Sequence, residues 1–221
     1  EFSGNSFHTN REYGVNIEAS QVRKLDVGSD YLGTGSPNGK PYVFAAGTIS
    51  EAGPLDDPQS LHVWQPLNAP YRVADDEPNY DQQILVEDAT ALALEAGTTI
   101  YFTGDSQLLV RAGSFLGSGG TAAQPVLLTS DGAQPGSWYG VSVHNSAAVL
   151  NHLVIEWAGR EFAGSGSSLA FISTGATLAK ELNGVHITGS AGCALQLGDE
   201  SLLTSRDVTF GPDIAEEDRY C

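Results

Sequence analysis

The chain contains no methionine, two cysteines and only 10 lysine and arginine residues among its 221. Those 10 basic residues oppose 27 acidic ones, which gives a formal net charge of −17. A charge of this sign repels nucleic acid and anionic lipid, so neither is expected as a partner. No apolar run approaches the roughly 18 residues of a membrane-spanning helix, so membrane insertion is not expected. Because an initiator methionine is absent, the chain is expected to be a processed or excised piece of a longer protein.

The composition of the chain is typical of a packed β protein. Hydrophobic residues make up 41% of the chain and charged residues 17%, which is too apolar for a disordered polypeptide. The chain also has 26 glycines, many of them at the ends of short apolar stretches. Glycine suits such positions because a sharp bend needs a positive φ or a missing side chain.

Three short apolar strand motifs recur in the same cyclic order through the second half of the chain. The first column reads TIYF (99–102), PVLL (125–128), LVIEW (153–157), GVHIT (184–188) and DVTF (207–210). The second column reads QLLV (107–110), GVSV (140–143), SLAFI (168–172) and CALQL (193–197). The third column reads SFLG (114–117), AVL (148–150), ATL (176–178) and SLL (201–203). We expect about five coils from these motifs.

The spacing of equivalent residues predicts a solenoid. Val141 and Leu169 are 28 residues apart, and Leu169 and Leu195 are 26 residues apart. A period of this length with three strands per turn is typical of stacked coils, in which strands about 4.8 Å apart pair in parallel. Alternation within the strands predicts that Val141 and Val143 point inward, together with their equivalents in the neighbouring coils.

The stretch LALEAGTTIYFTGDSQLLVRAGSFLGSGGTAAQPVLLTS, followed by GSWYGVSV and LNHLVIEWAG, resembles the repeats of right-handed parallel β-helix proteins of bacterial exported and cell-surface type. The resemblance covers most of residues 84–210 and again residues 2–25. It implies an all-β, right-handed parallel β-helix with three strands per coil, in an extracellular context that faces polysaccharide. It assigns no catalytic residue, because this fold hosts lyases, hydrolases, adhesins and inert stalks.

The chain is expected to have three parts. Residues 1–45 read as the end of a preceding β-helix coil and its connection, and residues 91–221 as regular coils. Residues 46–90 are rich in proline and acid, so we expect an irregular insertion that caps or links the solenoid, with a binding loop as the alternative. The two ends have a similar layout, which suggests a tandem array with a unit from about Tyr13 to Tyr220 and neighbouring modules of a longer chain as partners.

The sequence favours a non-catalytic extracellular module that displays structure or binds polysaccharide weakly. The acidic pairs Asp56–Asp57 and Asp75–Asp76 lie in irregular sequence, where nothing fixes the spacing that glycoside chemistry requires. The alternative is a polysaccharide lyase or glycoside hydrolase that uses residues of the 46–90 segment or of the 158–166 insertion. In that insertion Arg160 and Glu161 form either a small site or an ordinary surface ion pair.

Four aromatic residues are the candidates for carbohydrate binding: Trp64, Tyr71, Trp138 and Tyr139. They fall in turns or irregular sequence, where a ring can remain exposed and stack on a sugar. The competing interpretation is that each ring fills a corner of the core.

No cofactor is expected, with calcium as the one exception considered. The best cluster of hard oxygen ligands is Asp75, Asp76, Glu77 and Asp81, and the alternative is a solvated acidic loop. The five histidines do not form a convincing transition-metal site, because His144 and His152 lack a carboxylate or cysteine at ligand spacing.

A disulfide between Cys193 and Cys221 is expected if the protein is exported. The two residues are 28 positions apart, about one coil, so they should lie on neighbouring rungs of the solenoid. The register is open, since pairing Tyr220 instead of Cys221 with Cys193 would put the two cysteines on opposite faces. The alternative is a buried Cys193 and an unrelated terminal thiol.

Overall fold

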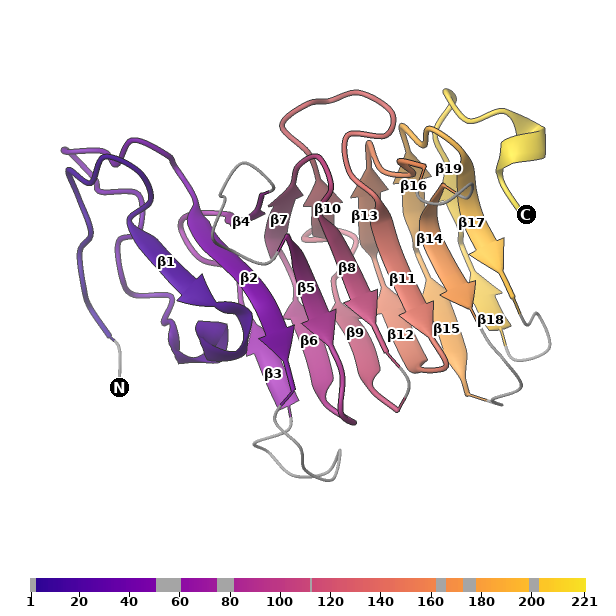
Figure 1. Ribbon diagram of the computed structural model, residues 1–221, viewed down its shortest axis with the longest axis horizontal. Coiled ribbons are helices and arrows are strands. Elements are labelled where there is room, and N and C mark those ends of the chain that lie inside the picture. Colours follow the sequence, from indigo (N-terminus) through magenta and orange to yellow (C-terminus); the bar gives the residue numbers. More distant parts are fainter. Residues whose placement is uncertain are drawn as a thin grey trace.

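A computed structural model describes residues 3–50, 61–74, 82–111, 113–161, 166–172, 178–198 and 203–221. These residues wind into a parallel β-solenoid in which successive coils stack along one long axis, with the two ends of the chain at opposite ends of the stack (Figure 1). The described part contains two short 3₁₀ helices, η1 (Ala19–Lys24) and η3 (Glu216–Asp218). No helix in these residues is long and apolar enough to cross a membrane.

Three columns of parallel strands form the walls of the solenoid. The first sheet contains β1 (Val15–Glu18), β2 (Val43–Ile49), β4 (Tyr71–Val73), β7 (Thr99–Phe102), β10 (Val126–Thr129), β13 (Leu153–Glu156), β16 (His186–Thr188) and β19 (Thr209–Phe210). The second sheet contains β5 (Gln83–Val86), β8 (Gln107–Val110), β11 (Gly140–His144), β14 (Ser167–Ile172) and β17 (Cys193–Leu197). The third sheet contains β3 (Leu61–Trp64), β6 (Ala91–Glu95), β9 (Phe115–Gly119), β12 (Ala147–Asn151), β15 (Lys180–Asn183) and β18 (Leu203–Arg206).

Strand β2 joins the first two sheets. Its first residues pair with β1 and β4, and its last three pair with β5. Gly47 lies where the strand passes from one sheet to the other. Its φ is +111°, a backbone conformation that residues with a side chain rarely adopt. The bend at this glycine therefore allows one strand to serve two walls.

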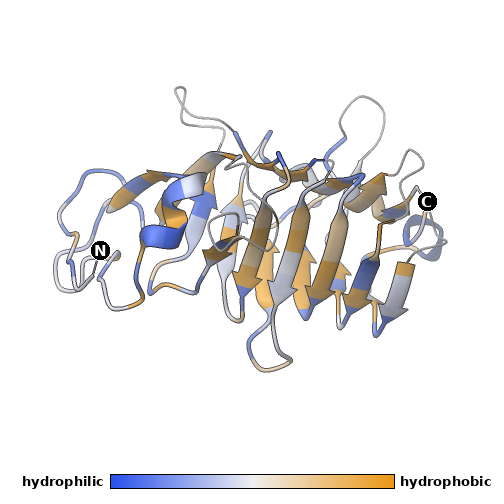
Figure 2. Ribbon diagram, turned by 90° about the horizontal axis from the view of Figure 1, so that it is seen from below, coloured by the Kyte–Doolittle hydropathy of each residue, from blue (hydrophilic) through white to orange (hydrophobic). Residues whose placement is uncertain are grey.

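The predicted inward residues form the core. Val141, Leu169 and Leu195 are opposite one another in β11, β14 and β17, and all three are buried. Val143 and Phe171 form the next inward row and are also buried. Stacking of equivalent apolar side chains removes their area from water, which stabilises neighbouring coils mutually. Figure 2 shows the hydrophobic residues concentrated in the strands of the middle coils.

The expectation that residues 46–90 are irregular is wrong for much of that segment. Strands β3, β4 and β5 lie within it, and each pairs in parallel with a strand of the next coil. Pro66 and Pro70 lie between β3 and β4, so they need not donate to the ladder. The third sheet consequently has six strands, about one coil more than the motifs indicated.

The third column differs from the expectation in its last two coils. Most of the apolar triplets ATL (176–178) and SLL (201–203) lies outside the described residues. The strands that the structure describes there are β15 and β18, with sequences KELN and LTSR, and β18 begins at Leu203, the last residue of SLL. Lys180 faces inward in a row between Ala148 and Leu203, and it is 1% exposed. A polar strand of this kind has no apolar alternation to mark it.

Candidate functional site

Three of the four aromatic residues expected to bind carbohydrate lie in the core. Trp64, Tyr71 and Trp138 are 0%, 1% and 0% exposed, so the prediction that their rings face solvent is wrong. The rings of Trp64 and Tyr71 pack with their centroids 5.0 Å apart. Trp138 stacks on Phe102 at 4.3 Å, and its indole N–H donates to the carbonyl of Glu156 at 2.8 Å. These rings fill corners, because a bulky apolar group next to a bend is stabilised by burial.

Tyr139 is half-buried and borders a groove of about 210 Å³ on the outer face of the second sheet. Hydrogen-bonding side chains line the groove: Gln107, Ser142, Ser167 and Gln196. Its apolar lining residues are Leu109, Ala170 and Ile172. His144 and Arg160 complete the described lining. An apolar surface combined with convergent polar groups is typical of a small-molecule or glycan site.

Small side chains at the outward positions explain the hollow. Because Val141 and Val143 point into the core, Gly140 and Ser142 stand on the outer face. Gly140 is opposite Gln107 of β8, and Ser142 is opposite Leu109 on one side and Ala170 on the other. A glycine, a serine and an alanine next to longer side chains leave a depression across the strands.

Gly140 cannot be replaced without strain. Its φ is +118°, and a Cβ at this position would lie 2.5 Å from the carbonyl oxygen of Ser167. The backbone of β14 therefore passes closer to Gly140 than a side chain would allow.

A network of three side chains forms one rim. The Tyr139 hydroxyl donates to Asp105 Oδ1 at 3.1 Å, and Arg160 Nη2 lies 3.3 Å from the same oxygen. The guanidinium of Arg160 also lies over the Tyr139 ring, 5.8 Å from its centroid. Asp105 thus holds both neighbours in place and compensates the charge of Arg160. The sequence left Arg160 and Glu161 as either a small site or a surface ion pair, and the ion pair that the structure shows for Arg160 is with Asp105.

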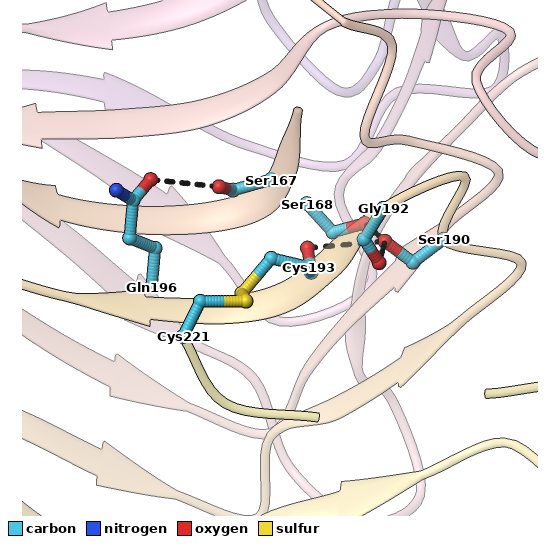
Figure 3. Close-up of a disulfide and its surroundings, with 7 residues drawn as sticks. All are labelled: Ser167, Ser168, Ser190, Gly192, Cys193, Gln196 and Cys221. Atoms are coloured by element: carbon cyan, nitrogen blue, oxygen red, sulfur yellow. Dashed lines mark hydrogen bonds between the residues drawn. A yellow bond between two sulfur atoms is a disulfide. The ribbon is translucent and has the colours of Figure 1, made fainter. Parts of the chain in front are cut away.

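The other end of the groove lies next to the C-terminal tail. The Ser167 hydroxyl donates to the Gln196 side chain at 2.8 Å across β14 and β17 (Figure 3). Ser167 is opposite Cys193, which forms a disulfide with Cys221 at a Cα–Cα distance of 6.1 Å. Tyr220 pairs with Leu195, so the two cysteines are not in direct register, but they lie close enough to form the expected disulfide.

His144 brings a titratable group to the groove. Burial, followed by the nearby charge of Arg111, lowers the pKa of His144 below its ordinary value of 6.5. Arg111 is itself paired with Glu87 at 3.1 Å. The imidazole is therefore mostly neutral at pH 7 and can donate or accept a hydrogen bond.

The expected calcium ligands Asp75, Asp76, Glu77 and Asp81 lie outside the described residues, as do Asp56 and Asp57. Within the described residues, no group of three or more histidine, cysteine, aspartate or glutamate side chains is close enough to hold a metal ion.

A larger cleft of about 960 Å³ lies at the N-terminal end of the solenoid. Val15 and Ile17 of β1 line it and are only half-buried, whereas Val43 and Ala45, opposite them in β2, are fully buried. In the described residues β1 pairs with β2 alone, so this cleft is the uncovered end of the core. The groove on the second sheet, whose rim is the hydrogen-bonded network of Asp105, Tyr139 and Arg160, is the stronger candidate for a ligand site.

Comparisons with protein-family models, with curated proteins and with solved structures found no match to this chain.

Proposed function

We propose that the chain is a non-catalytic, polysaccharide-binding module of a larger surface or secreted protein, with its ligand site in the groove of the second sheet. The observation that carries the proposal is the combination of an aromatic rim at Tyr139, amide groups at Gln107 and Gln196, and an apolar floor at Leu109 and Ala170. Sugars present alternating C–H surfaces and hydroxyls, which such a lining complements through ring stacking and hydrogen bonds.

Binding is favoured over cleavage by the chemistry of the lining. Most glycoside hydrolases need two carboxyl groups that flank the scissile bond. None of the described residues that line the groove is an aspartate or glutamate. Asp105 at the rim is already bound to Tyr139 and Arg160. The lyase or hydrolase alternative is therefore an outcome of the test and not a second proposal.

An exported, extracellular setting of bacterial type belongs to the same proposal. It is supported by the disulfide between Cys193 and Cys221, since such bonds persist in oxidising compartments. The net charge of −17 is compatible with a solvated protein surface outside the cell. In this setting a solenoid that carries a glycan groove on one wall would serve as one module among others.

A glycan array with the purified chain tests the proposal, followed by titration of any glycan that binds. Tyr139→Ala should weaken binding at least about tenfold, because stacking and the fixed rim are lost together. Tyr101→Ala is the matched control, since Tyr101 is also half-buried but lies on the first sheet, where its ring packs against Tyr42 at 5.3 Å.

Reducing-sugar and unsaturated-product assays on the same glycan address cleavage. Binding without product is the expected result. An equal loss of glycan affinity in the two tyrosine variants would mean that the ligand binds elsewhere. Steady release of product would replace the binding proposal with the enzyme alternative.

A further inference from the structure

The positive charges that border the groove are compensated within the protein. Arg160 is 3.3 Å from Asp105, and Arg111, which acts on His144, is 3.1 Å from Glu87. The remaining polar lining consists of amides, hydroxyls and the imidazole of His144, whose lowered pKa keeps it mostly neutral at pH 7. An anionic glycan would therefore meet no uncompensated arginine in this lining and would approach a molecule with a net charge of −17.

The groove runs across the strands and so along the solenoid axis. Apart from Tyr139 and Arg160, its lining residues come from β8, β11, β14 and β17, with Gln107 at one end and Gln196 at the other. Neighbouring strands are separated by about 4.8 Å, so three intervals span about 14 Å. This length accommodates a short run of sugar residues.

We infer that the groove selects an uncharged polysaccharide segment that lies along the solenoid axis, in preference to a uronate or sulfated chain. This inference rests on the proposed function and adds the class and direction of the ligand. The neutral chain would place its C–H surfaces on Leu109 and Ala170 and its hydroxyls against Gln107, Ser142 and Gln196. Asp105 acts as the selectivity residue, because it cancels the charge that would otherwise attract a carboxylate.

Calorimetric titration with two sets of probes tests the inference. The neutral set consists of gluco-, xylo- and manno-oligosaccharides of one to six residues, and the anionic set consists of oligogalacturonates and oligomannuronates of the same lengths. We expect a neutral series to bind, with affinity that rises with length and then levels off once the groove is filled. Anionic chains should bind at least about tenfold more weakly at low salt, and the difference should shrink as salt screens the repulsion.

The Asp105→Asn variant isolates the charge. It keeps an oxygen that can accept from Tyr139 but leaves Arg160 uncompensated, so anionic chains should gain affinity while neutral binding changes little. Glu181→Gln on β15 is the matched control, since it removes one negative charge at an exposed position of the third sheet.

The outcomes separate failure of the proposed glycan binding from failure of the inference about the class and direction of the ligand. If neither set binds, the proposed function fails. If only anionic chains bind, or bind more tightly, the groove is still a glycan site but its selectivity is opposite to the inference. Equal affinity for monosaccharides and hexasaccharides would overturn the axial arrangement. An equal effect of Asp105→Asn and Glu181→Gln would show that general repulsion, and not Asp105, sets the selectivity.

Discussion

Removal of the disulfide should loosen the C-terminal coil before the rest of the solenoid. The Cys193–Cys221 bond closes a loop of 28 residues. In the chain-entropy description, a loop of this length restricts the unfolded state by an amount worth about 3.5 kcal/mol at 25 °C. That figure is an upper value for the double variant Cys193→Ser/Cys221→Ser, because a freed tail can also separate locally while the other coils remain folded.

The contacts of the C-terminal tail, residues 219–221, define which interactions should weaken in the double variant. The amides of Leu195 and Leu197 donate to the carbonyls of Arg219 and Cys221, at 3.0 and 3.4 Å. The ring of Tyr220 packs edge-on against Phe210 at 5.2 Å. These contacts are few and partly exposed, so the tethering bond supplies much of the order of the tail.

Hydrogen exchange measured residue by residue is the appropriate assay. In the double variant, exchange at the Leu195 amide should accelerate by up to about two orders of magnitude, while amides of β8 and β11 should keep their protection. Urea unfolding should shift to a lower midpoint in parallel. Unchanged exchange at Leu195 would show that strand pairing alone holds the tail, and two free thiols in the denatured, unreduced wild type would show that no bond forms.

Three further substitutions have distinct expected outcomes. Trp138→Ala should lower the free energy of unfolding by about 3–5 kcal/mol in urea titrations, because it empties a core position stacked on Phe102. His144→Asn should flatten the pH dependence of stability: with its pKa lowered in the folded state, the wild-type imidazole takes up a proton on unfolding, so wild-type stability falls as pH drops below about 6.5. Comparison of urea midpoints at pH 5.5 and 7.5 checks this sign. Ser142→Leu should fill the groove and abolish glycan binding in titration, with stability within about 0.5 kcal/mol of wild type.

The columns of strands could be predicted because alternation and spacing are local properties of the sequence. QLLV and GVSV each place apolar residues at every second position, and their period matches one coil. The prediction failed at β15 because Lys180 is a charged residue in an inward row, where packing with Ala148 and Leu203 overrides the preference of a lysine for solvent. It failed in residues 46–90 because prolines in corners look the same in sequence as prolines that disrupt a strand.

Most of the candidate site could not be predicted from the sequence, for a different reason. Asp105 and Arg160 are far apart in sequence. Only the stacking of two coils brings the Arg160 guanidinium to the Asp105 carboxylate. The aromatic residues were assigned from the local composition around them, which cannot show whether a corner points its ring inward. Tyr139 and Trp138 are adjacent, yet one borders the groove and the other is buried.

One signal for the groove was nevertheless present in the alternation itself. Once Val141 and Val143 are placed inward, Gly140 and Ser142 must face outward, and the same reading applied to SLAFI puts Ala170 on that surface. A wall whose outward positions are small in neighbouring coils and larger on either side must be hollow there. Because inward and outward positions alternate residue by residue, the outward row can vary with the ligand while the inward row keeps the coils together. This separation explains how a sequence that specifies its fold so regularly can confine its candidate ligand chemistry to a few outward residues.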